Sequence, residues 1–435
     1  MYTIITCLLL FAAEPFSVQD TGGADEGILK ITPWKTIVLE AEYGGQWVVA
    51  GDLDGDGQPE IVSAENFNEA DTHYTSAVAA QRLDGTVLWT WGTPDKGRKT
   101  WHHDVACQIH DWDGDGAAEV VLCGDGAIVE LDGKSGAEKR HIPIPKDASD
   151  CLVFCDLSGA GRPSDILVKN RYEQIWAFNL AGECLWTSTL PGGSRTAHQP
   201  FPVDLDGDGR DEIMAGYALL NHDGSVRWVY VSDKVDLRRG HLDCARVLAR
   251  GATPEDWRIA MSFCGANALA VADGNGRTVW ELTGHHFESI NIGTLSSEAP
   301  KPQIVVDIDH QPEGNSPIWI LDPEGNKLGE IVTRYSRHHK LVDWTGDGLC
   351  ELVVAGNRAL YDGQGKRLAT FAVPEAALED AAGVEISVLT GDMDGDGVPD
   401  VLITTPTRVF LYRNELGSGP AETVPLGTGL NVTLY

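Results

Sequence analysis

The 435-residue chain lacks several features that mark common functional classes. It has only 33 lysines and arginines against 65 acidic residues, and the net charge of −32 argues against binding to nucleic acid or to an anionic membrane surface. No P-loop, dinucleotide fingerprint or nucleophile elbow occurs, which disfavours nucleotide-dependent enzymes and serine hydrolases. No stretch has the spacing of an amphipathic helix, so an all-β fold is expected.

Long hydrophobic runs are also missing, apart from one at residues 4–13. That run is too short to span a bilayer and is typical of a signal peptide. We therefore predict a signal segment over residues 1–20, a single domain over residues 21–435, and a secreted or periplasmic protein without a membrane span.

The nine cysteines leave two interpretations open. Cys7 lies in the predicted signal segment, and the remaining eight are an even number, as disulfide pairing requires. Cys107 with Cys123, and Cys244 with Cys264, flank predicted hairpin loops and are candidate pairs. Buried free thiols in strands are the favoured interpretation.

A repeated acidic loop indicates the architecture. DLDGDGQPE, DWDGDGAAE, DLDGDGRDE, DWTGDGLCE and DMDGDGVPD begin at residues 52, 111, 204, 343 and 392, and DLSGAGRPSD at 156 is a degraded copy. Two further units without the loop fit the long gap, at 241–263 and 288–308. The pattern predicts a β-propeller of about eight four-stranded blades, with seven as the alternative, closed by residues 36–40 or 431–435.

A tryptophan marks the fourth strand of several units. Trp89, Trp186, Trp228 and Trp280 each stand four residues after a turn glycine, which can supply the positive φ of a tight hairpin. These four positions therefore predict the outer strands of four blades.

Each acidic loop offers oxygen ligands at positions 1, 3, 5 and 9 and a glycine at position 6, a pattern that surrounds one hard cation. About five Ca²⁺ ions are predicted, each between the first and second strands of a blade. Plain Asx–Gly turns are the alternative, but they leave crowded carboxylates to repel one another. The predicted ligands are Asp52, Asp54, Asp56, Glu60, Asp111, Asp113, Asp115, Glu119, Asp204, Asp206, Asp208, Glu212, Asp343, Asp347, Glu351, Asp392, Asp394, Asp396 and Asp400.

The loops resemble the FG-GAP or VCBS repeat of calcium-binding propellers. A more specific resemblance, to rhamnogalacturonan lyases of the polysaccharide lyase family-eleven type, rests on KNRYEQIW, HQPFPVDLDGDGRDE, GHLD and SRHHKLVDWTGDG. It implies an eight-bladed, calcium-containing propeller that cleaves an acidic polysaccharide by β-elimination. The alternative is a non-catalytic propeller that binds a glycan or a protein, as in adhesion.

Basic and histidine-rich loops precede the innermost strands, at 96–104, 194–200, 238–243, 284–289 and 336–340. We expect them on the face opposite the acidic loops, where they form a cationic mouth for an acidic polysaccharide or oligosaccharide. A metal site is the alternative use of the histidines. The predicted acid–base residues are His103, His241, His286, His339, Tyr172 and Tyr217, and the predicted substrate-binding residues are Lys169, Arg171, His198 and Arg358.

Overall fold

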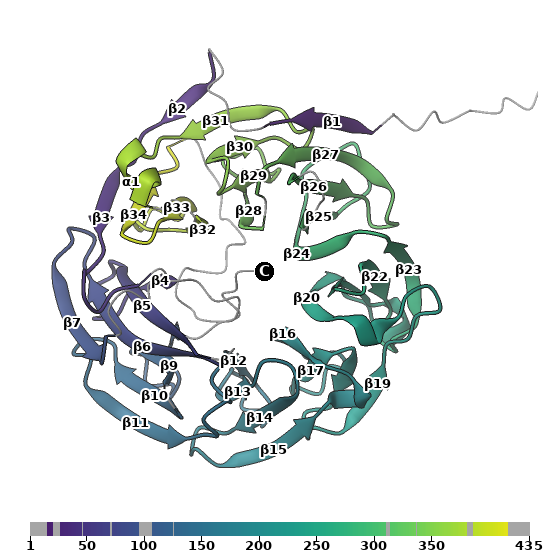
Figure 1. Ribbon diagram of the computed structural model, residues 1–435, viewed down its shortest axis with the longest axis horizontal. Helices are drawn as coiled ribbons and strands as arrows, with labels where there is room; N and C mark the ends of the chain where they lie inside the picture. Colours follow the sequence, from purple (N-terminus) through teal and green to yellow (C-terminus); the bar gives the residue numbers. More distant parts are fainter. Residues whose placement is uncertain are drawn as a thin grey trace, which may run out of the picture.

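The computed structural model describes residues 15–20, 27–45, 47–69, 72–94, 107–124, 126–309, 314–335, 337–380 and 386–415. In these ranges the chain forms eight sheets that surround a central axis as propeller blades (Figure 1). Strands that follow one another in the chain within a blade are antiparallel, and the chain runs outward from the centre to the rim. The prediction of eight blades is confirmed, and the seven-bladed alternative is wrong.

The first four blades each contain four consecutive strands. They are β4 (Trp47–Gly51), β5 (Glu60–Glu69), β6 (Thr72–Gln81) and β7 (Val87–Gly92); β8 (Cys107–His110), β9 (Glu119–Gly124), β10 (Ala127–Asp132) and β11 (Glu138–Pro143); β12 (Cys151–Cys155), β13 (Asp165–Lys169), β14 (Gln174–Phe178) and β15 (Cys184–Thr189); and β16 (Thr196–Val203), β17 (Glu212–Gly216), β18 (Ala218–Leu220) and β19 (Val226–Val229).

The remaining blades follow the same order, and three of them take up a strand from the N-terminal region. They are β20 (His241–Ala249), β21 (Arg258–Cys264), β22 (Ala268–Ala272) and β23 (Thr278–Thr283); β24 (His286–Gly293), β25 (Gln303–Asp309), β26 (Ser316–Leu321) and β27 (Lys327–Thr333); β28 (His339–Val342), β29 (Glu351–Val354), β30 (Ala359–Tyr361) and β31 (Arg367–Phe371); and β32 (Ser387–Gly391), β33 (Asp400–Thr404) and β34 (Arg408–Tyr412).

Helix is scarce in the described ranges. The only α-helix there is α1 (Glu375–Asp380), and single 3-10 turns are η1 (Pro191–Gly193), η2 (Leu237–Arg239) and η3 (Pro254–Asp256). None of these helices has the length and apolar character needed to cross a membrane.

The N-terminal region forms a belt around the rim of three consecutive blades. β1 (Phe16–Gln19) pairs in parallel with β27, β2 (Leu29–Ile31) pairs in parallel with β31, and β3 (Lys35–Val38) pairs antiparallel with β34 (Figure 1). β3 completes the last blade, as the sequence predicted for residues 36–40. Residues 431–435, the other predicted closing strand, lie outside the described residues, as do residues 1–14 of the predicted signal segment.

The marker tryptophans join neighbouring blades. Trp186, on β15, donates a hydrogen bond from Nε1 to the carbonyl of His222 at 2.9 Å, in the next blade. Its ring covers Gly224, where an added Cβ would lie 2.7 Å from the indole. Trp89, Trp228 and Trp280 repeat this arrangement on the following blade. At Gly365 the belt residue Phe16 takes the place of the tryptophan.

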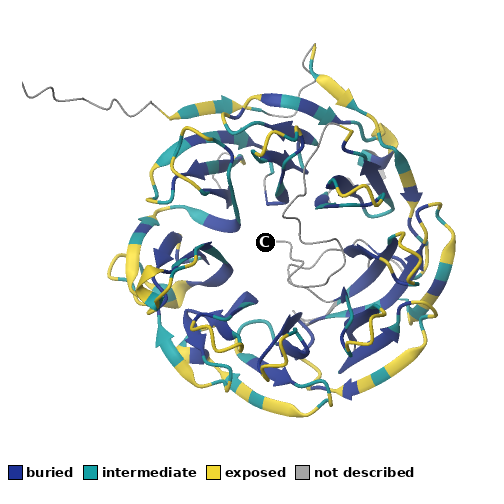
Figure 2. Cartoon of the chain, turned by 180° about the vertical axis from the view of Figure 1, so that it is seen from behind, coloured by how far each residue is buried: buried dark blue, intermediate teal, exposed yellow. Residues whose placement is uncertain are grey.

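Burial is strongest in the inner three strands of each blade, whereas residues of the outer strands alternate between buried and exposed (Figure 2). None of the eight cysteines in the described ranges forms a disulfide. Cys107 stands opposite Leu122, and Cys244 stands opposite Ser262, so neither candidate pair is aligned across its hairpin. The interpretation as buried thiols in strands is confirmed for five of them, whereas Cys184 is exposed and Cys264 and Cys350 are half-buried.

Candidate functional site

The acidic loops join the first and second strands of their blades, as predicted. In the first loop the Asp52 carboxylate accepts hydrogen bonds from the backbone N–H groups of Gly55 and Gly57, and Glu60 accepts one from Leu53 at 2.9 Å. Carboxylate oxygens of Asp52, Asp54 and Glu60 lie within 4.8 Å of one another. This convergence of hard oxygen donors on a rigid turn fits a calcium ion.

The other four full loops repeat these backbone hydrogen bonds at positions 1 and 9. The degraded copy has a similar set with shifted positions, since Asp156 accepts from Ala160 and Gly161, at positions 5 and 6, and Asp165, at position 10, accepts from Leu157. Position 3 is a serine there and position 5 an alanine, so the turn conformation does not depend on those two carboxylates.

Basic side chains from the outer strands contact several acidic loops, which the sequence reading missed. Nζ of Lys139 lies 2.9 Å from Asp113 and 2.6 Å from Glu119. Nη1 of Arg227 lies 2.8 Å from Asp206 and 3.0 Å from Glu212. The carboxylates in these loops are therefore partly neutralised by the protein itself, which lessens the repulsion that the sequence argument relied on.

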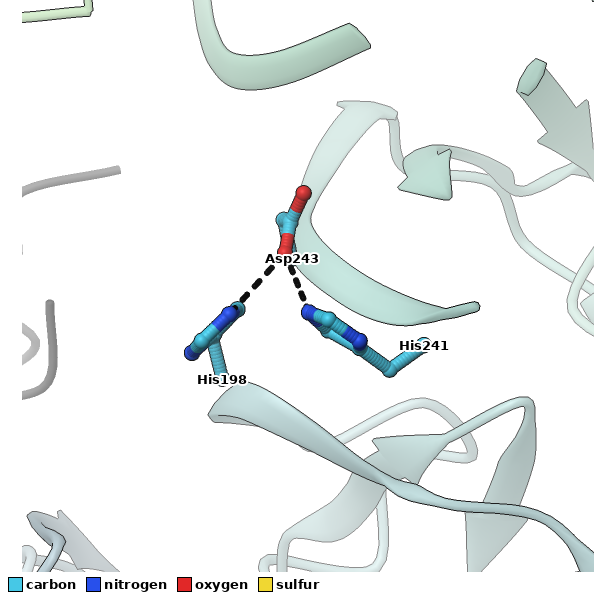
Figure 3. Close-up of side chains that lie close together, drawn as sticks. All are labelled: His198, His241 and Asp243. Atoms are coloured by element: carbon cyan, nitrogen blue, oxygen red, sulfur yellow. Dashed lines mark ion pairs between the residues drawn. The ribbon is translucent and has the colours of Figure 1, made fainter. Parts of the chain in front are cut away.

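The opposite ends of the innermost strands carry a buried cluster of histidine and carboxylate. Asp243, on β20, lies with Oδ1 3.0 Å from Nε2 of His241 and 3.5 Å from Nε2 of His198, on β16 (Figure 3). All three side chains are buried. We call this group the His–Asp cluster.

A cationic and aromatic surface adjoins the His–Asp cluster, and we call its residues Arg171, Tyr172 and Arg195 the channel mouth. The Tyr172 ring lies with its centroid 4.7 Å from that of His241 and 5.7 Å from that of His198. The guanidinium carbons of Arg171 and Arg195 lie 5.1 and 5.2 Å from the Tyr172 centroid. Arg195 is exposed and the other two are half-buried, so the mouth can meet a ligand.

Asp150 anchors the turn that carries the mouth. Its carboxylate lies 2.8 Å from Nζ of Lys169 and 2.7 Å from Nδ1 of His73, which arrives on the long strand β6 from two blades away. Lys169 also donates to the carbonyls of Asn170 and Arg171 at 3.3 Å each. Lys169 is completely buried, so it supports the turn that carries Arg171 and Tyr172 from behind the channel mouth.

A second polar cluster, which we call the thiol cluster, joins Cys264, on β21 of the same blade, to His286, Glu288 and Arg337 of the blade that follows and its neighbour. Nε2 of His286 lies 3.1 Å from Sγ of Cys264 and 3.1 Å from Oε1 of Glu288. Arg337 contacts both Glu288, at 2.5 Å, and Asp309, at 2.9 Å. Cys264 also interacts with Asp243, which connects this thiol cluster with the His–Asp cluster.

The charge states follow from burial and neighbouring charges. Burial, with the charges of Lys169 and Arg171, lowers the pKa of His241 to about 3, so its imidazole is neutral. Burial and the charge of Glu288 raise the pKa of Asp243. The 3.0 Å contact between His241 and Asp243 therefore lies in surroundings that disfavour the charged form of both side chains.

In the thiol cluster, charged neighbours outweigh burial and favour the charged forms of both His286 and Glu288. Burial opposes ionisation of Glu288, but His286 and Arg337 outweigh it and hold the pKa of Glu288 below its usual value. Burial would likewise lower the pKa of His286, but the hydrogen bond and charge of Glu288 raise it.

The predicted site residues fall into separate groups. Tyr172, His198, His241 and Arg171 come together, and His286 lies in the adjoining thiol cluster. Tyr217 is buried on Phe263, with burial raising the pKa of its phenol. His339 is buried on β28. Arg358 lies in the β29–β30 turn, where its electrostatic partners are Glu375, Tyr412 and Arg367. His103 lies outside the described residues.

The sequence reading missed the acidic members of both clusters. Asp243 stands two residues after His241, and Glu288 two residues after His286, each at the start of an innermost strand. Residues two apart in a strand point to the same side, so the repeated His-x-acid pattern was the available signal.

Sequence comparisons find two kinds of similarity. Residues 343–403 match the FG-GAP-like repeat family. Rhamnogalacturonan endolyase YesW of Bacillus subtilis is 28% identical over 242 residues, covering 42% of this chain and 39% of that protein. Rhamnogalacturonan exolyase YesX of the same organism is 23% identical over 384 residues, covering 72% of this chain and 60% of that protein. The chain thus spans less than two thirds of either relative.

Structural comparisons agree on the fold. The crystal structure of YesW matches with a TM-score of 0.58 at 18% identity, over 86% of this chain and 75% of that one. The Vibrio cholerae biofilm matrix protein Bap1 matches with a TM-score of 0.59 at 13% identity, over 89% of this chain and 91% of that one. The chain therefore has an FG-GAP-like repeat, shares the fold of these solved structures, and is similar in sequence to rhamnogalacturonan lyases.

Proposed function

We propose that the chain is an exported polysaccharide lyase that cleaves a uronate-containing, rhamnogalacturonan-like glycan by β-elimination at the channel mouth. The observation that carries the proposal is the arrangement of the mouth, where two guanidinium groups flank the ring of Tyr172. The sequence similarity to an endolyase and an exolyase of rhamnogalacturonan supports the substrate class.

The chemistry of β-elimination matches these groups. The C5–H bond of the uronate and the C4–O4 bond break, a C4–C5 double bond forms, and the departing O4 receives a proton. Cations must neutralise the uronate carboxylate and stabilise the negative charge that develops as C5 loses its proton. A positioned acid–base group must move the proton.

Arg171 and Arg195 are assigned to the uronate carboxylate, because they are the cations at the accessible edge of the mouth. Tyr172 is assigned to proton transfer: as the phenolate it takes the C5 proton, and as the resulting phenol it gives that proton to the departing O4. His198 and His241 turn their Nε2 atoms toward Asp243, so they support the Tyr172 ring from the buried side (Figure 3). Of the predicted acid–base residues, this assignment therefore selects Tyr172 rather than a histidine.

Calcium in the acidic loops belongs to the proposal as a structural component. The loops lie at the opposite ends of the innermost strands from the channel mouth, because each loop follows the strand whose first residues adjoin the mouth. Bound calcium there would tie the first two strands of a blade together and leave the mouth unchanged.

The test is a comparison of variants on a panel of glycans. Purified protein is incubated with rhamnogalacturonan and with polygalacturonate, and ultraviolet absorbance of the unsaturated product is followed. Tyr172→Phe should lose at least about 100-fold in kcat, the scale of an acid–base group. Arg171→Ala and Arg195→Ala should raise KM, with an effect that shrinks as salt increases.

The matched control is Arg277→Ala, which removes an exposed arginine in the β22–β23 turn, at the end of its blade opposite the channel mouth. It should leave kcat and KM unchanged. Full activity in Tyr172→Phe would overturn the assignment of the acid–base group. Binding of uronate glycans without any unsaturated product would replace the lyase with the non-catalytic binding propeller.

A further inference from the structure

The five full acidic loops differ in whether the protein itself supplies a counter-charge for the last carboxylate. Position 9 is buried in every one of them, at Glu60, Glu119, Glu212, Glu351 and Asp400. Burying a carboxylate costs free energy unless a cation or hydrogen bonds compensate it. The source of the positive charge therefore decides how strongly each loop depends on calcium.

A lysine provides this charge in the loop at residues 111–119. Oε1 of Glu119 lies 2.6 Å from Nζ of Lys139, which also lies 2.9 Å from Asp113, at position 3. Oε2 of Glu119 accepts a hydrogen bond from the backbone N–H of Trp112 at 2.9 Å. Both oxygens of the buried carboxylate are therefore engaged by the protein.

The loop at residues 204–212 repeats this arrangement with an arginine. Oε1 of Glu212 lies 3.0 Å from Nη1 of Arg227, which also lies 2.8 Å from Asp206. Oε2 of Glu212 accepts a hydrogen bond from the backbone N–H of Leu205 at 3.0 Å. We call this loop and the one before it the paired loops.

The outer strands explain why only these two loops are paired. Lys139 and Arg227 each stand three residues after a turn glycine of positive φ, near the start of β11 and β19, which places them beside the acidic loop of their own blade. The equivalent residue is aliphatic in the other five blades whose outer strand follows such a turn, namely Leu88, Leu185, Val279, Leu328 and Leu368. Those blades have no basic side chain at this position.

The three remaining full loops have no such cation at position 9. In the part of the chain that the structure describes, no basic side chain forms an ion pair with Glu60, Glu351 or Asp400, although Arg82 and Arg413 contact position 3 of two of these loops. A bound calcium ion would supply the positive charge that these buried carboxylates lack.

We propose that Lys139 and Arg227 take the place of calcium in the paired loops, so that the chain has three acidic loops of high calcium affinity and two of low affinity. A calcium ion in a paired loop must bind beside a fixed positive charge or displace it, and either event weakens binding. The inference rests on the calcium sites of the proposed function and is independent of the lyase chemistry.

The test counts bound calcium as its free concentration rises. The full-length protein is stripped with a chelator and dialysed to equilibrium against a series of buffered calcium concentrations, and bound ions are measured by elemental analysis. Three ions per chain should bind first. Further ions should need at least about 10-fold more free calcium, because a unit charge about 4 Å from a divalent ion opposes binding to that extent even in water.

Lys139→Met should raise the number of high-affinity ions from three to four. Asp115→Ala, which removes the position-5 carboxylate of the same loop, should cancel that gain in the double variant. Lys139→Arg keeps the charge and should bind calcium as the wild type does. Lys134→Met serves as the control, because it removes an exposed lysine from the turn before β11 and should change nothing. Circular dichroism in saturating calcium checks that each variant is folded.

Five ions of equal affinity in the wild type would overturn the proposal. A folded Lys139→Met variant that binds calcium as the wild type does would also overturn it, and so would a gained ion that survives Asp115→Ala. A chain that binds no calcium would remove the calcium sites themselves. The lyase activity is measured separately, through the unsaturated product, so the two proposals fail separately.

Discussion

Replacing Gly224 with alanine should destabilise the propeller far more than the same change at Gly85. Both glycines occupy the turn before the outer strand of a blade, with φ of +81° and +88°. Alanine in this left-handed region costs about 1–2 kcal/mol at either position. The two turns differ in their surroundings, because an added Cβ at Gly85 meets nothing within 4 Å, whereas at Gly224 it lies 2.7 Å from the Trp186 ring.

The additional cost at Gly224 comes from moving the indole. Overpacking of this kind costs about 1–3 kcal/mol. A displaced Trp186 also stretches its 2.9 Å hydrogen bond to His222, which is worth about 0.5–1.5 kcal/mol. We therefore expect a loss of about 1–2 kcal/mol for Gly85→Ala and about 2–5 kcal/mol for Gly224→Ala.

Urea unfolding followed by far-ultraviolet circular dichroism measures both losses, provided that the slopes of the transitions agree. A double-mutant cycle gives the sharper result, because in a Trp186→Leu background the cost of Gly224→Ala should fall to that of Gly85→Ala. Equal losses for the two single variants, or no coupling to Trp186, would refute the role of the tryptophan as a clamp between blades.

Three further predictions follow from the loops, the buried ion pairs and the belt. Chelation should lower the melting temperature, and an unchanged melting temperature in excess chelator would contradict the calcium assignment. Elemental analysis should show that Asp56→Ala has lost one calcium per chain, whereas Asp233→Ala, outside the loops, has lost none. Asp150→Asn should cost about 3–5 kcal/mol at neutral pH, because it leaves Lys169 buried without its counter-charge. Burial opposes ionisation of Asp150, but Lys169 and His73 hold its pKa well below the usual 3.8. The stabilisation from the Asp150 carboxylate is therefore present above that value and disappears as pH falls through the lower, folded-state pKa. The difference in melting temperature between wild type and Asp150→Asn should narrow below about pH 4, and a difference that widens there would contradict this. Deleting residues 1–20 should lower the melting temperature more than deleting 1–14, since only the longer deletion removes β1 and the 2.7 Å bond from Tyr361 to Asp20; equal melts would show that β1 contributes nothing.

Much of the fold was predictable because the repeat signals are local. An acidic loop or a glycine turn determines the conformation of the few residues around it, so Asp52 or Gly85 could be placed from the sequence. The belt was not predictable beyond β3, because its strands are three or four residues long and their partners lie more than 300 residues away. The contact between His73 and Asp150 is hidden because it joins side chains from two different blades, and the repeat pattern does not predict contacts between blades.

The site was predicted only in part, since the prediction grouped all the histidine-rich loops into a single cationic mouth. The structure shows that strand alternation, rather than charge, groups the residues. His241 and Asp243 face the same side of β20, whereas Arg358 meets different neighbours in a distant turn. The basic partners of the acidic loops were also missed, because Lys139 and Arg227 reach the loops from strands that follow them in the chain.

The mass of the products tests the proposed lyase most directly. The wild-type protein is incubated with rhamnogalacturonan, and the released oligosaccharides are analysed by mass spectrometry. Because β-elimination adds no water, each new non-reducing end should be an unsaturated uronate, one water lighter than the product of hydrolysis. Saturated products carrying that water would contradict the account, and so would an intact glycan under conditions where the protein is folded and calcium-loaded.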